Sequence, residues 1–405
     1  MINNEFHILI DILQFIIFLY ITISVLNLFI FSFASLFNYK PKYTKNNTSK
    51  RIALLIPAYR EDEVIFEVVV SALLHNYPKN KFDIIVIADS FNKSSIEKLK
   101  KLDIILFAKD FKISTKSRAL NYALNNLEEK YDIACILDAD NIMQQGFLLK
   151  ISNSFSSGKF VAVQGHRTAK NLNTNFAVLD AVSEEINNSI FRKGQRVLGL
   201  SSFLIGSAMA FEYSLFKSMM KAIEVVGGFD KELEMRLLKG NYKTEYLPDA
   251  YVYDEKVQNA RVFTKQRRRW LSAQFHFFGK NFIPAWKELF TKGNIEYFFK
   301  AMQYLQPPRI ILLGILSIIT FLSYFLNSNM WFLLWLTTFI SLILVFLFAI
   351  PRKFYNLRTL TAVAVLPKGF ILMILSLFKI RNANKKFIHT KHTYNAFQIK
   401  KKKRS

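Results

Sequence analysis

An apolar segment near the amino terminus limits this chain to folds that include a membrane helix. Residues 8–37 carry a single charged side chain, Asp11. About 20 apolar residues are enough to cross a bilayer as a helix. A cleaved secretory signal has a shorter apolar core, a basic start and a small-residue cleavage site, which this segment lacks. We therefore expect residues 1–45 to form a permanent transmembrane anchor.

Basic residues indicate on which side of the membrane the chain continues after this anchor. The first seven residues contain no Lys or Arg, and the apolar segment is followed by Lys40, Lys42, Lys45, Lys50 and Arg51. Lys and Arg are enriched in cytoplasmic loops. The pattern predicts an outside amino terminus and a multi-pass protein of the inner (plasma) membrane with its next domain in the cytoplasm. The Lys-, Asn-, Ile- and Phe-rich usage is typical of an AT-rich bacterial genome.

The composition favours a membrane protein over a nucleic-acid-binding protein. The chain is 51% hydrophobic and has a net charge of +25. A basic chain suits phosphate backbones, but here the basic residues lie beside apolar segments, where they flank a bilayer. We therefore expect membrane lipids as partners and no nucleic acid. The single cysteine, Cys135, lies in an apolar run and predicts a buried side chain without a disulfide.

Residues 51–260 have the pattern of a soluble α/β domain. The expected strands are 52–56, 84–88, 104–108, 133–137 and 160–163, and the expected helices lie near 64–74, 94–101, 116–129 and 142–155. Strands that alternate with helices predict βαβ units and a parallel sheet. Ligands bind at the carboxyl ends of such strands. The residues that follow each strand are therefore the candidates for a site.

The strand at 133–137 ends in two carboxylates, Asp138 and Asp140. Mg²⁺ and Mn²⁺ prefer oxygen ligands and commonly share carboxylates with substrate phosphates. The alternative is an ordinary polar strand end, because Asp is common there. No glycine-rich loop follows the first strand, which argues against a dinucleotide-binding or P-loop enzyme.

Five motifs, in order along the chain, resemble those of family-two inverting glycosyltransferases. They are Pro57-Ala-Tyr-Arg-Glu61, Ala88-Asp89-Ser90, Lys116-Ser-Arg-Ala-Leu-Asn121, Asp138-Ala-Asp140 and Gln266-Arg-Arg-Arg-Trp270. The last motif is typical of the membrane-embedded processive branch, which includes cellulose, chitin and hyaluronan synthases. The resemblance implies an α/β GT-A fold over residues 46–272 and a hexosyltransferase activity helped by Mg²⁺ or Mn²⁺.

The resemblance also implies roles for the donor-binding residues. Tyr59 and Glu61 would border the uracil of a UDP-sugar, Asp89 would meet the base or the ribose, and Lys116 would lie near the diphosphate. The carboxylate pair would hold the phosphates and the metal. The alternatives are ordinary packing for Tyr59 and a solvated helix start for Lys116.

Two residues compete for the role of general base. An inverting transfer needs a carboxylate that takes the proton of the acceptor hydroxyl. The family carries it in a Thr-Glu-Asp type motif at the start of a helix, and the matching region here is Gly227–Leu238, with Lys231 where a carboxylate is usual. The alignment favours Glu232. Asp230 is the competitor, and it is also a natural N-cap for the helix that follows.

Gln266, Arg269 and Trp270 lie about one helical turn apart on adjacent faces of an expected helix. The resemblance implies that Trp270 holds the acceptor sugar and that Gln266 and Arg269 meet the donor. The alternative is a basic interfacial helix whose Arg261 and Lys265, together with residues 267–269, face anionic lipids. The two roles use different faces of the helix.

The remainder of the chain is expected to return to the membrane. Residues 273–308 are predicted as interfacial helices, and residues 309–380 as membrane helices with spans at 310–326 and 330–350. Segment 360–378 holds Lys368 between Pro367 and Gly369. A full crossing there would put a basic tail outside, so we expect a re-entrant or interfacial helix pair and three true spans.

Residues 381–405 are predicted as a basic cytoplasmic tail. Its stretch Phe387-Ile-His-Thr-Lys-His392 is similar to the gating loop of cellulose synthases, which would bring Thr390 near the catalytic centre. His389 and His392 also have a metal-ligand spacing, without an evident third ligand.

These expectations combine into a function. We expect transfer of a sugar from a UDP-sugar to a growing β-linked glycan. The alternatives are transfer of one sugar to a lipid-linked acceptor and a catalytically inactive membrane scaffold. Three spans enclose only a narrow channel, so export of a polymer would call for a homo-oligomer or a partner subunit.

Overall fold

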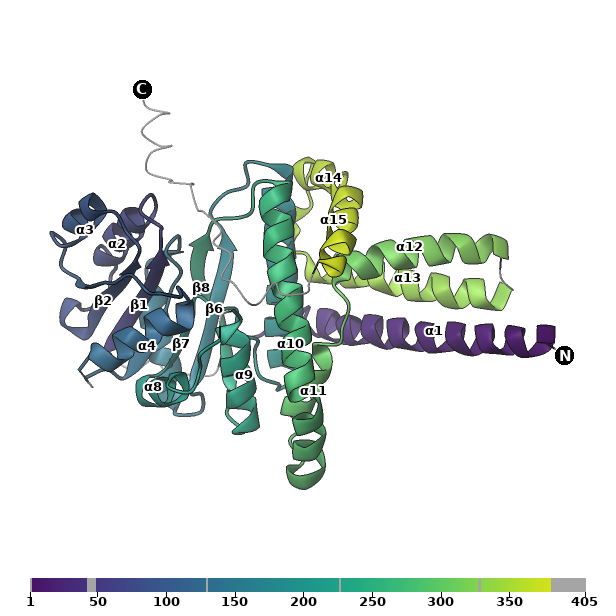
Figure 1. Ribbon diagram of the computed structural model, residues 1–405, viewed down its shortest axis with the longest axis horizontal. Coiled ribbons are helices and arrows are strands. Elements are labelled where there is room, and N and C mark those ends of the chain that lie inside the picture. Colours follow the sequence, from purple (N-terminus) through teal and green to yellow (C-terminus); the bar gives the residue numbers. More distant parts are fainter. Residues whose placement is uncertain (1, 42–48, 129, 226, 327–328, 380–405) are drawn as a thin grey trace.

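The computed structural model describes residues 2–41, 49–128, 130–225, 227–326 and 329–379, with side chains from residue 9 onward. An α/β domain lies on one side of a long upright helix, and three apolar helices project from the other side (Figure 1). The molecule is therefore divided into a sheet-based domain and a membrane-type bundle, with helices between them.

One eight-stranded sheet forms the centre of the α/β domain. Its strands are β1 (Ile52–Tyr59), β2 (Phe82–Asp89), β3 (Ile105–Ala108), β4 (Ile133–Ile136), β5 (Ile142–Met143), β6 (Ala162–Ala169), β7 (Met209–Glu212) and β8 (Thr244–Asp254). The spatial order is β3-β2-β1-β4-β7-β6-β8-β5. Strands β3, β2, β1 and β4 are parallel neighbours, so their carboxyl ends share one edge.

Helices cover both faces of this sheet. They are α2 (Ile65–Leu73), α3 (Lys93–Leu99), α4 (Lys116–Asn126), α5 (Phe147–Ser154), α6 (Asn175–Asn187), α7 (Gln195–Val197), α8 (Tyr213–Met220) and α9 (Phe229–Lys239), with the short turns η1 (Lys79–Lys81) and η2 (Phe155–Ser157) and the π-helix η3 (Asn188–Gly194). Leu54 of β1 packs with α2 and α5 on one face, and the next residue, Leu55, packs with α4, α8 and α9 on the other. Burial on both faces explains why β1 is continuously apolar.

The predicted parallel direction is correct for β1–β4, β6 and β8, and wrong for β5 and β7. Strand β7 runs antiparallel to both β4 and β6, and β5 runs antiparallel to β8. The helix expected at 142–155 begins only at Phe147. Residues 142–143 pair with β8 instead, and Gly146, at φ 83°, supplies the left-handed turn that starts the helix.

Helix α10 (Ala260–Lys292) is a single helix of 33 residues, and α11 (Ile295–Gln303) follows it. The side chain of Asn259 caps the start of α10 by accepting from the amide of Val262 at 3.0 Å, and Gly293, at φ 63°, ends it. The expected boundary between residues 272 and 273 lies inside this helix. The Gln-x-x-Arg-Trp residues and the expected interfacial stretch therefore belong to one continuous element.

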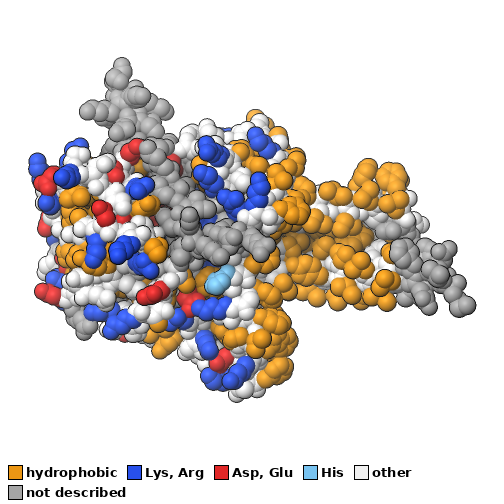
Figure 2. Space-filling view, viewed as in Figure 1, with side chains coloured by type: hydrophobic (Ala, Val, Ile, Leu, Met, Phe, Trp, Pro, Cys, Tyr) orange, Lys and Arg blue, Asp and Glu red, His pale blue; other side chains and the backbone are white. Residues whose placement is uncertain are grey.

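The apolar helices satisfy the length and hydropathy expected of membrane spans. Within the described residues, three helices are long and apolar enough to cross a bilayer: the Leu9–Ala34 part of α1 (Ile2–Ala34), α12 (Arg309–Leu326) and α13 (Asn329–Ala349). After η4 (Arg352–Phe354), helices α14 (Leu357–Val363) and α15 (Leu366–Phe378) form a pair bent by 45° that passes the same test only when taken together, as a broken span or a re-entrant loop. Hydrophobic side chains cover the projecting helices, whereas charged side chains gather over the α/β domain (Figure 2).

The α/β domain packs directly onto the apolar helices through α6 and η3. Val178 and Ile190 share a hydrophobic cluster with Leu28 of α1 and Trp335 of α13. The two parts approach closely at Gly194, where an added Cβ would lie 2.1 Å from the carbonyl oxygen of Phe31. Only a residue without a side chain fits between η3 and α1 at this point.

Candidate active site

The ends of β1 and β2 form one side of the candidate site. The backbone turns sharply after each strand, because Arg60 and Ser90 both have positive φ, at 54° and 58°. The amide of Arg60 donates to the carbonyl of Asp89 at 3.1 Å. The buried Asp89 carboxylate accepts from the Ser90 hydroxyl at 2.9 Å. The carboxylate is thus held at the strand end, as predicted, and Tyr59 lies beside it under the Arg60 guanidinium, 5.1 Å from the ring centre.

The carboxylates that follow β4 differ in their surroundings. The Asp138 side chain is about one-third exposed, at 35%, and receives the ammonium of Lys116 from the start of α4. The same ammonium donates to the carbonyl of Gly206 at 2.5 Å. Asp140 is buried and accepts from the side-chain amide of Asn141 at 3.0 Å and from the amide of Glu255 at 2.7 Å. Asp138 is therefore the accessible carboxylate, and Asp140 is the fixed one.

The donor set fits a divalent ion that is shared with a ligand. Among the described residues, no group of three or more His, Cys, Asp and Glu side chains is arranged to hold a metal. Asp138 and Asp140 supply carboxylate oxygens, and Mg²⁺ is commonly bound by one or two carboxylates together with substrate phosphates and waters. These residues fit an ion completed by a diphosphate, rather than a cage made by the protein alone.

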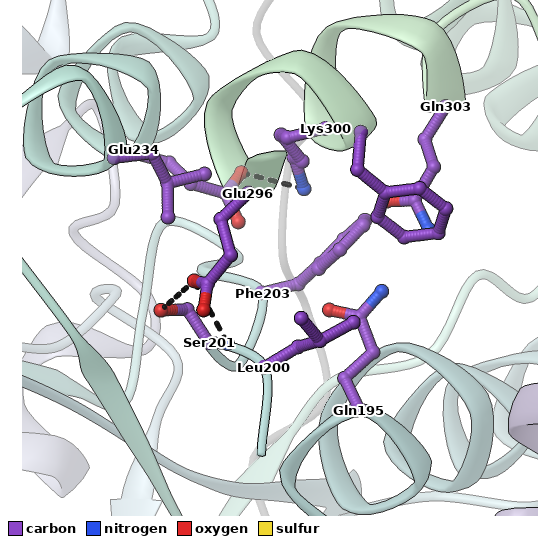
Figure 3. Close-up of a pocket in the computed structure, with 10 residues that line it drawn as sticks. Gln195, Leu200, Ser201, Phe203, Glu234, Glu296, Lys300 and Gln303 are labelled. Atoms are coloured by element: carbon purple, nitrogen blue, oxygen red, sulfur yellow. Dashed lines mark hydrogen bonds and ion pairs between the residues drawn. The ribbon is translucent and has the colours of Figure 1, made fainter. Parts of the chain in front are cut away.

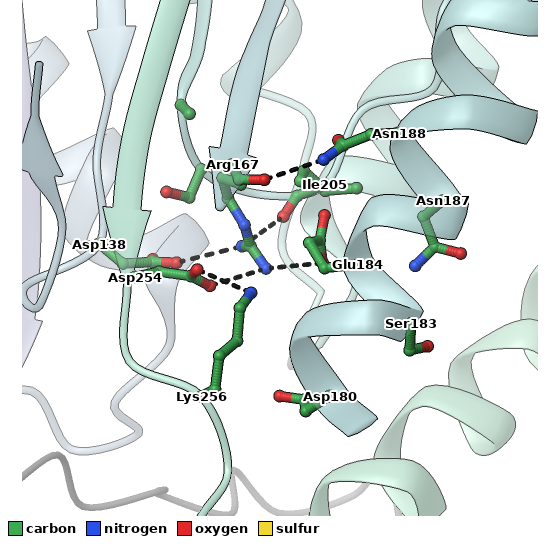
Figure 4. A network of polar contacts seen from close by, with 12 residues as sticks. Asp138, Arg167, Asp180, Ser183, Glu184, Asn187, Asn188, Ile205, Asp254 and Lys256 are labelled. Carbon is green, nitrogen blue, oxygen red and sulfur yellow. Dashed lines mark hydrogen bonds and ion pairs between the residues drawn. The ribbon is translucent and has the colours of Figure 1, made fainter. Parts of the chain in front are cut away.

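A buried arginine, Arg167 of β6, lies behind the carboxylate pair. Its guanidinium is 3.9 Å from Asp138, 3.2 Å from Asp254 and 3.3 Å from Glu184 (Figure 4). Burial alone would lower the pKa of Arg167, but these carboxylates raise it above its ordinary value. The guanidinium therefore stays charged and holds the end of β8 and helix α6 against Asp138.

Lys256 completes this network from the segment after β8. Its ammonium is 2.7 Å from Asp254, and both side chains are buried. Burial raises the pKa of Asp254 to about 6, although Lys256 and Arg167 oppose the shift. Sequence analysis missed Arg167 and Lys256. The available signal for Arg167 was a charged residue within a strand, where a buried charge needs a partner.

The two candidates for general base face different neighbours. Glu232 is buried, and its carboxylate is bound by Lys280 of α10 at 2.6 Å and by Arg236 at 2.9 Å. Burial would raise the pKa of Glu232, but the hydrogen bonds from both cations lower it. The Asp230 carboxylate lies beside Gly206, since a Cβ built on that glycine would be 3.6 Å from its Oδ2. Asp230 is therefore next to the Lys116–Asp138 pair, and Glu232 is turned toward α10.

The predicted Gln-x-x-Arg-Trp residues lie on the first turns of α10. Burial lowers the pKa of Arg269, while the nearby carboxylates of Asp138 and Asp230 raise it. Arg269 is thus close to both carboxylates of the site. The buried Oε1 of Gln266 has no hydrogen-bond partner among the described residues.

Arg267 of the same helix does not face lipid, because it is paired inside the protein. Its guanidinium is 2.6 Å from Asp180 of α6 and lies 4.3 Å from the centre of the Trp270 ring. The stacked guanidinium fixes the plane of the indole. The interfacial interpretation of residues 267–269 therefore fails at Arg267.

Comparison with known proteins identifies the domain. Residues 50–273, more than half of the chain, match the profile of the family described as glycosyltransferase like family 2. The chain belongs to this family. The prediction of a family-two glycosyltransferase domain with a GT-A fold is confirmed, and the narrower resemblance to cellulose, chitin and hyaluronan synthases remains a prediction.

Two curated relatives match this family-two domain at low identity. The probable glycosyltransferase YdaM of Bacillus subtilis is 24% identical over 250 residues, and beta-monoglucosyldiacylglycerol synthase of Synechocystis is 24% identical over 276 residues. The matches cover 57% and 64% of this chain, and the chain spans a little over half of each relative, 57% and 55%.

A solved structure, the mannosyltransferase PcManGT from Pyrobaculum calidifontis in complex with GDP-Man and Mn²⁺, aligns with 81% of this chain and 99% of its own. The TM-score is 0.49 at 16% identity.

One predicted site residue of the family-two domain has no structural description. Thr390 and the expected gating segment fall within residues 380–405, outside the described residues. Lys116, Asp138, Asp230 and Arg269 come together from the end of β4 and the starts of α4, α9 and α10, and Tyr59 and Asp89 lie side by side at the ends of β1 and β2. Glu232 is the exception, because its carboxylate is held by α10.

Proposed function

We propose that this protein is an inverting glycosyltransferase that moves a sugar from a UDP-sugar to an acceptor hydroxyl at the membrane surface. The observation that carries this proposal is that the ammonium of Lys116 lies close to two carboxylates, those of Asp138 and Asp230. Lys116 pairs with Asp138, and the Gly206 carbonyl that Lys116 also contacts lies beside Asp230. A leaving diphosphate and an activated hydroxyl need opposite charges placed this close together.

The donor half of the site uses residues from β1, β2, β4 and α4. Tyr59, Glu61 and Asp89 are proposed to bind the nucleoside, and Asp138 and Asp140 to hold Mg²⁺ or Mn²⁺ with the diphosphate. The metal, when bound, neutralises the charge that grows on the leaving group. Lys116 is proposed to exchange Asp138 for a phosphate oxygen when the donor binds, because a phosphate is an equally good partner for its ammonium.

The acceptor half of the site is assigned to Asp230 and α10. We propose Asp230, rather than Glu232, as the general base that takes the proton of the acceptor hydroxyl. Arg269, near both Asp138 and Asp230, is proposed to keep the donor and the base at a fixed separation. The face of Trp270, whose plane is fixed by Arg267, is proposed to stack on the acceptor sugar.

The arrangement of the apolar helices favours a lipid-linked acceptor over an exported polymer. Helices α1, α12 and α13 fill the space between them with Leu28, Leu316, Trp335 and Leu342, all buried. A growing β-linked glycan would need a passage made by an oligomer or a partner subunit. The name of the Synechocystis relative also indicates a glycosylated diacylglycerol as that enzyme's product. We propose transfer of one sugar to a lipid or lipid-linked acceptor, with glycan extension as the second candidate.

One assay separates these possibilities. The purified protein in nanodiscs with Mn²⁺ is incubated with a panel of UDP-sugars, with diacylglycerol or polyprenyl-phosphate lipids as acceptors, and both UDP release and product mass are measured. A product one sugar heavier than the lipid is expected. A ladder of products would favour glycan extension, and silence with every donor and acceptor would refute the transferase. The Asp140→Ala variant is the inactive control.

A further inference from the structure

Helix α9, which carries Asp230, is held by polar contacts from α11. The side-chain amide of Asn294, at the start of α11, donates to the carbonyl of Leu238 at 2.8 Å. Six residues further on, the ammonium of Lys300 lies 2.8 Å from the Glu234 carboxylate, and these side chains are only 4% and 5% exposed. Helix α9 is therefore fastened to α11 at its middle and near its carboxyl end, on the side of Asp230 that leads away from the loop before it.

The same face of α11 holds the loop formed by residues 201–206. Glu296 accepts from the amide and the hydroxyl of Ser201 at 3.2 and 2.7 Å. The second oxygen of Glu234 accepts from the amide of Leu204 at 3.3 Å. Figure 3 shows Lys300, Glu234, Glu296 and Ser201 converging around a small pocket. This loop ends at Gly206, whose carbonyl contacts Lys116.

A neighbouring side of α11 contacts the amino-terminal apolar helix. The Phe299 ring packs against Phe31 of α1, with ring centres 5.5 Å apart, and Ile295 is 65% exposed. Helix α11 thus contacts both the amino-terminal membrane-type helix and α9, which carries the proposed base.

We propose that the Lys300–Glu234 ion pair positions the general base, because it keeps α9 and the 201–206 loop aligned with α11. Asp230 and the Gly206 carbonyl then hold their places beside Lys116 and Asp138. The inference rests on the proposed function, in which Asp230 is the base. Lys300 and Glu234 are positioning residues, since neither reaches the reacting atoms.

This buried ion pair is expected to contribute more to the arrangement of α9 and α11 than to the stability of the protein. Taking two charges out of water costs about as much as their attraction returns, so a buried pair contributes mainly when it selects one arrangement. Burial lowers the pKa of Lys300 to about 7, against the attraction of Glu234. Lys231 and Asp230 of α9 also face this ammonium. Removing either partner leaves a buried charge without its counter-charge.

The test compares four variants of the full-length protein in nanodiscs. Lys300→Met and Glu234→Gln break the pair, and the double variant removes both charges at similar volume. Lys300→Arg keeps the positive charge, and the pocket beside residue 300 leaves room for the larger side chain. Lys292→Met is the matched control, because the Lys292 side chain is 59% exposed where it pairs with Glu288 at 3.0 Å. Donor KM, kcat, thermal unfolding and amide hydrogen exchange of residues 201–207 and 229–239 are measured for each.

Lys300→Met is expected to lower kcat by roughly 10- to 100-fold with the donor KM within about threefold, because a small misplacement of a catalytic group costs this much. Amide exchange should rise in both segments, and Lys300→Arg should restore much of kcat. The double variant should recover thermal stability but not kcat. A double variant with full kcat would overturn the inference.

The exchange measurement separates this inference from the proposed function. If the wild-type protein transfers no sugar, the function fails, and protection of residues 201–207 that depends on Lys300 would still support the positioning contact. If the wild-type protein is active and exchange in both segments is unchanged in Lys300→Met, the positioning contact is wrong while the function stands.

Discussion

The ammonium of Lys280 of α10 lies 2.6 Å from the Glu232 carboxylate, so the residue that alignment places at the base position is ion-paired with a neighbouring helix. Two residues earlier, Asp230 lies beside Gly206 and the Lys116–Asp138 pair. Successive residues of an α-helix are about 100° apart, so side chains two positions apart point in nearly opposite directions. Only one of these carboxylates can face the site.

Asp230→Asn is expected to lower kcat by about 10²- to 10⁴-fold, the usual contribution of a general base. Glu232→Gln should lower kcat by less than about tenfold, because glutamine can still accept the hydrogen bonds from Lys280 and Arg236 and only the negative charge is lost. Initial rates at saturating donor check both values, and thermal stabilisation by UDP with Mn²⁺ verifies that each variant still binds nucleotide. The reverse order of effects would return the base to Glu232.

Removal of divalent metal is expected to abolish transfer. EDTA should stop the reaction, and added Mn²⁺ or Mg²⁺ should restore it, because a diphosphate leaving group needs its charge neutralised. Asp140→Ala should lose activity at every metal concentration. UDP should raise the unfolding temperature of the wild-type protein only with metal present. Metal-independent stabilisation by UDP, or transfer in EDTA, would contradict the assignment of the Asp138–Asp140 pair.

Arg167→Met is expected to destabilise the domain by about 3–5 kcal/mol, the cost of leaving buried charges without their partner. Three carboxylates lie within 3.9 Å of this guanidinium, on Asp138, Glu184 and Asp254. Denaturant unfolding in detergent, followed by Trp fluorescence, measures the change. Arg261→Met, at an exposed position of α10, is the control and should remain within about 0.5 kcal/mol of wild type. Equal stabilities of the two variants would show that the buried network contributes nothing.

The stability of the protein is expected to fall in acid because of Glu185. Burial would raise the pKa of this carboxyl, but hydrogen bonds from His166 and Lys353 lower it to about 2 in the folded protein. A folded-state pKa below the unfolded value gives stability that is fully present above about pH 4.5 and is lost toward about pH 2. The loss is on the order of 3 kcal/mol over that window.

Thermal unfolding between about pH 5 and about pH 3 measures this dependence. Glu185→Gln should flatten the part of the curve that Glu185 contributes, while Glu97→Gln, on the exposed α3, should leave it unchanged. Since Lys353 lies just after α13, loss of the ion pair should also loosen the attachment of that helix. Identical acid dependence in wild type and Glu185→Gln would remove Glu185 as the cause.

The first half of the sheet and the positions of its polar strand ends could be predicted from the sequence. Strands β1, β2 and β4 contain short apolar runs, Asp89 is the last residue of β2 and Asp138 comes two residues after β4, so local pattern and strand-end geometry are sufficient. The order of β5 to β8 could not be predicted. Strand β7 separates β4 from β6, and no local signal indicates that pairing.

The parts of the site that escaped prediction depend on contacts between distant segments. Arg167 is tied to Glu184 and Asp254, which are 17 and 87 positions away in the sequence. The choice between Asp230 and Glu232 depends on Lys280 of α10, a residue 48 positions from Glu232. Periodicity identifies the start of α9 but not which neighbour packs against each side of it.

The contact at Gly194 determines how the α/β domain packs against α1. Because Gly194 has no side chain, η3 packs directly against the backbone of Phe31, and the two segments are in contact rather than only linked through the chain. The position of the domain relative to α1 is therefore set by this packing, and not only by the length of chain between α1 and β1. Under the proposed function, we expect this contact to set the height of the site above the bilayer and so to favour acceptors whose hydroxyl lies at that depth.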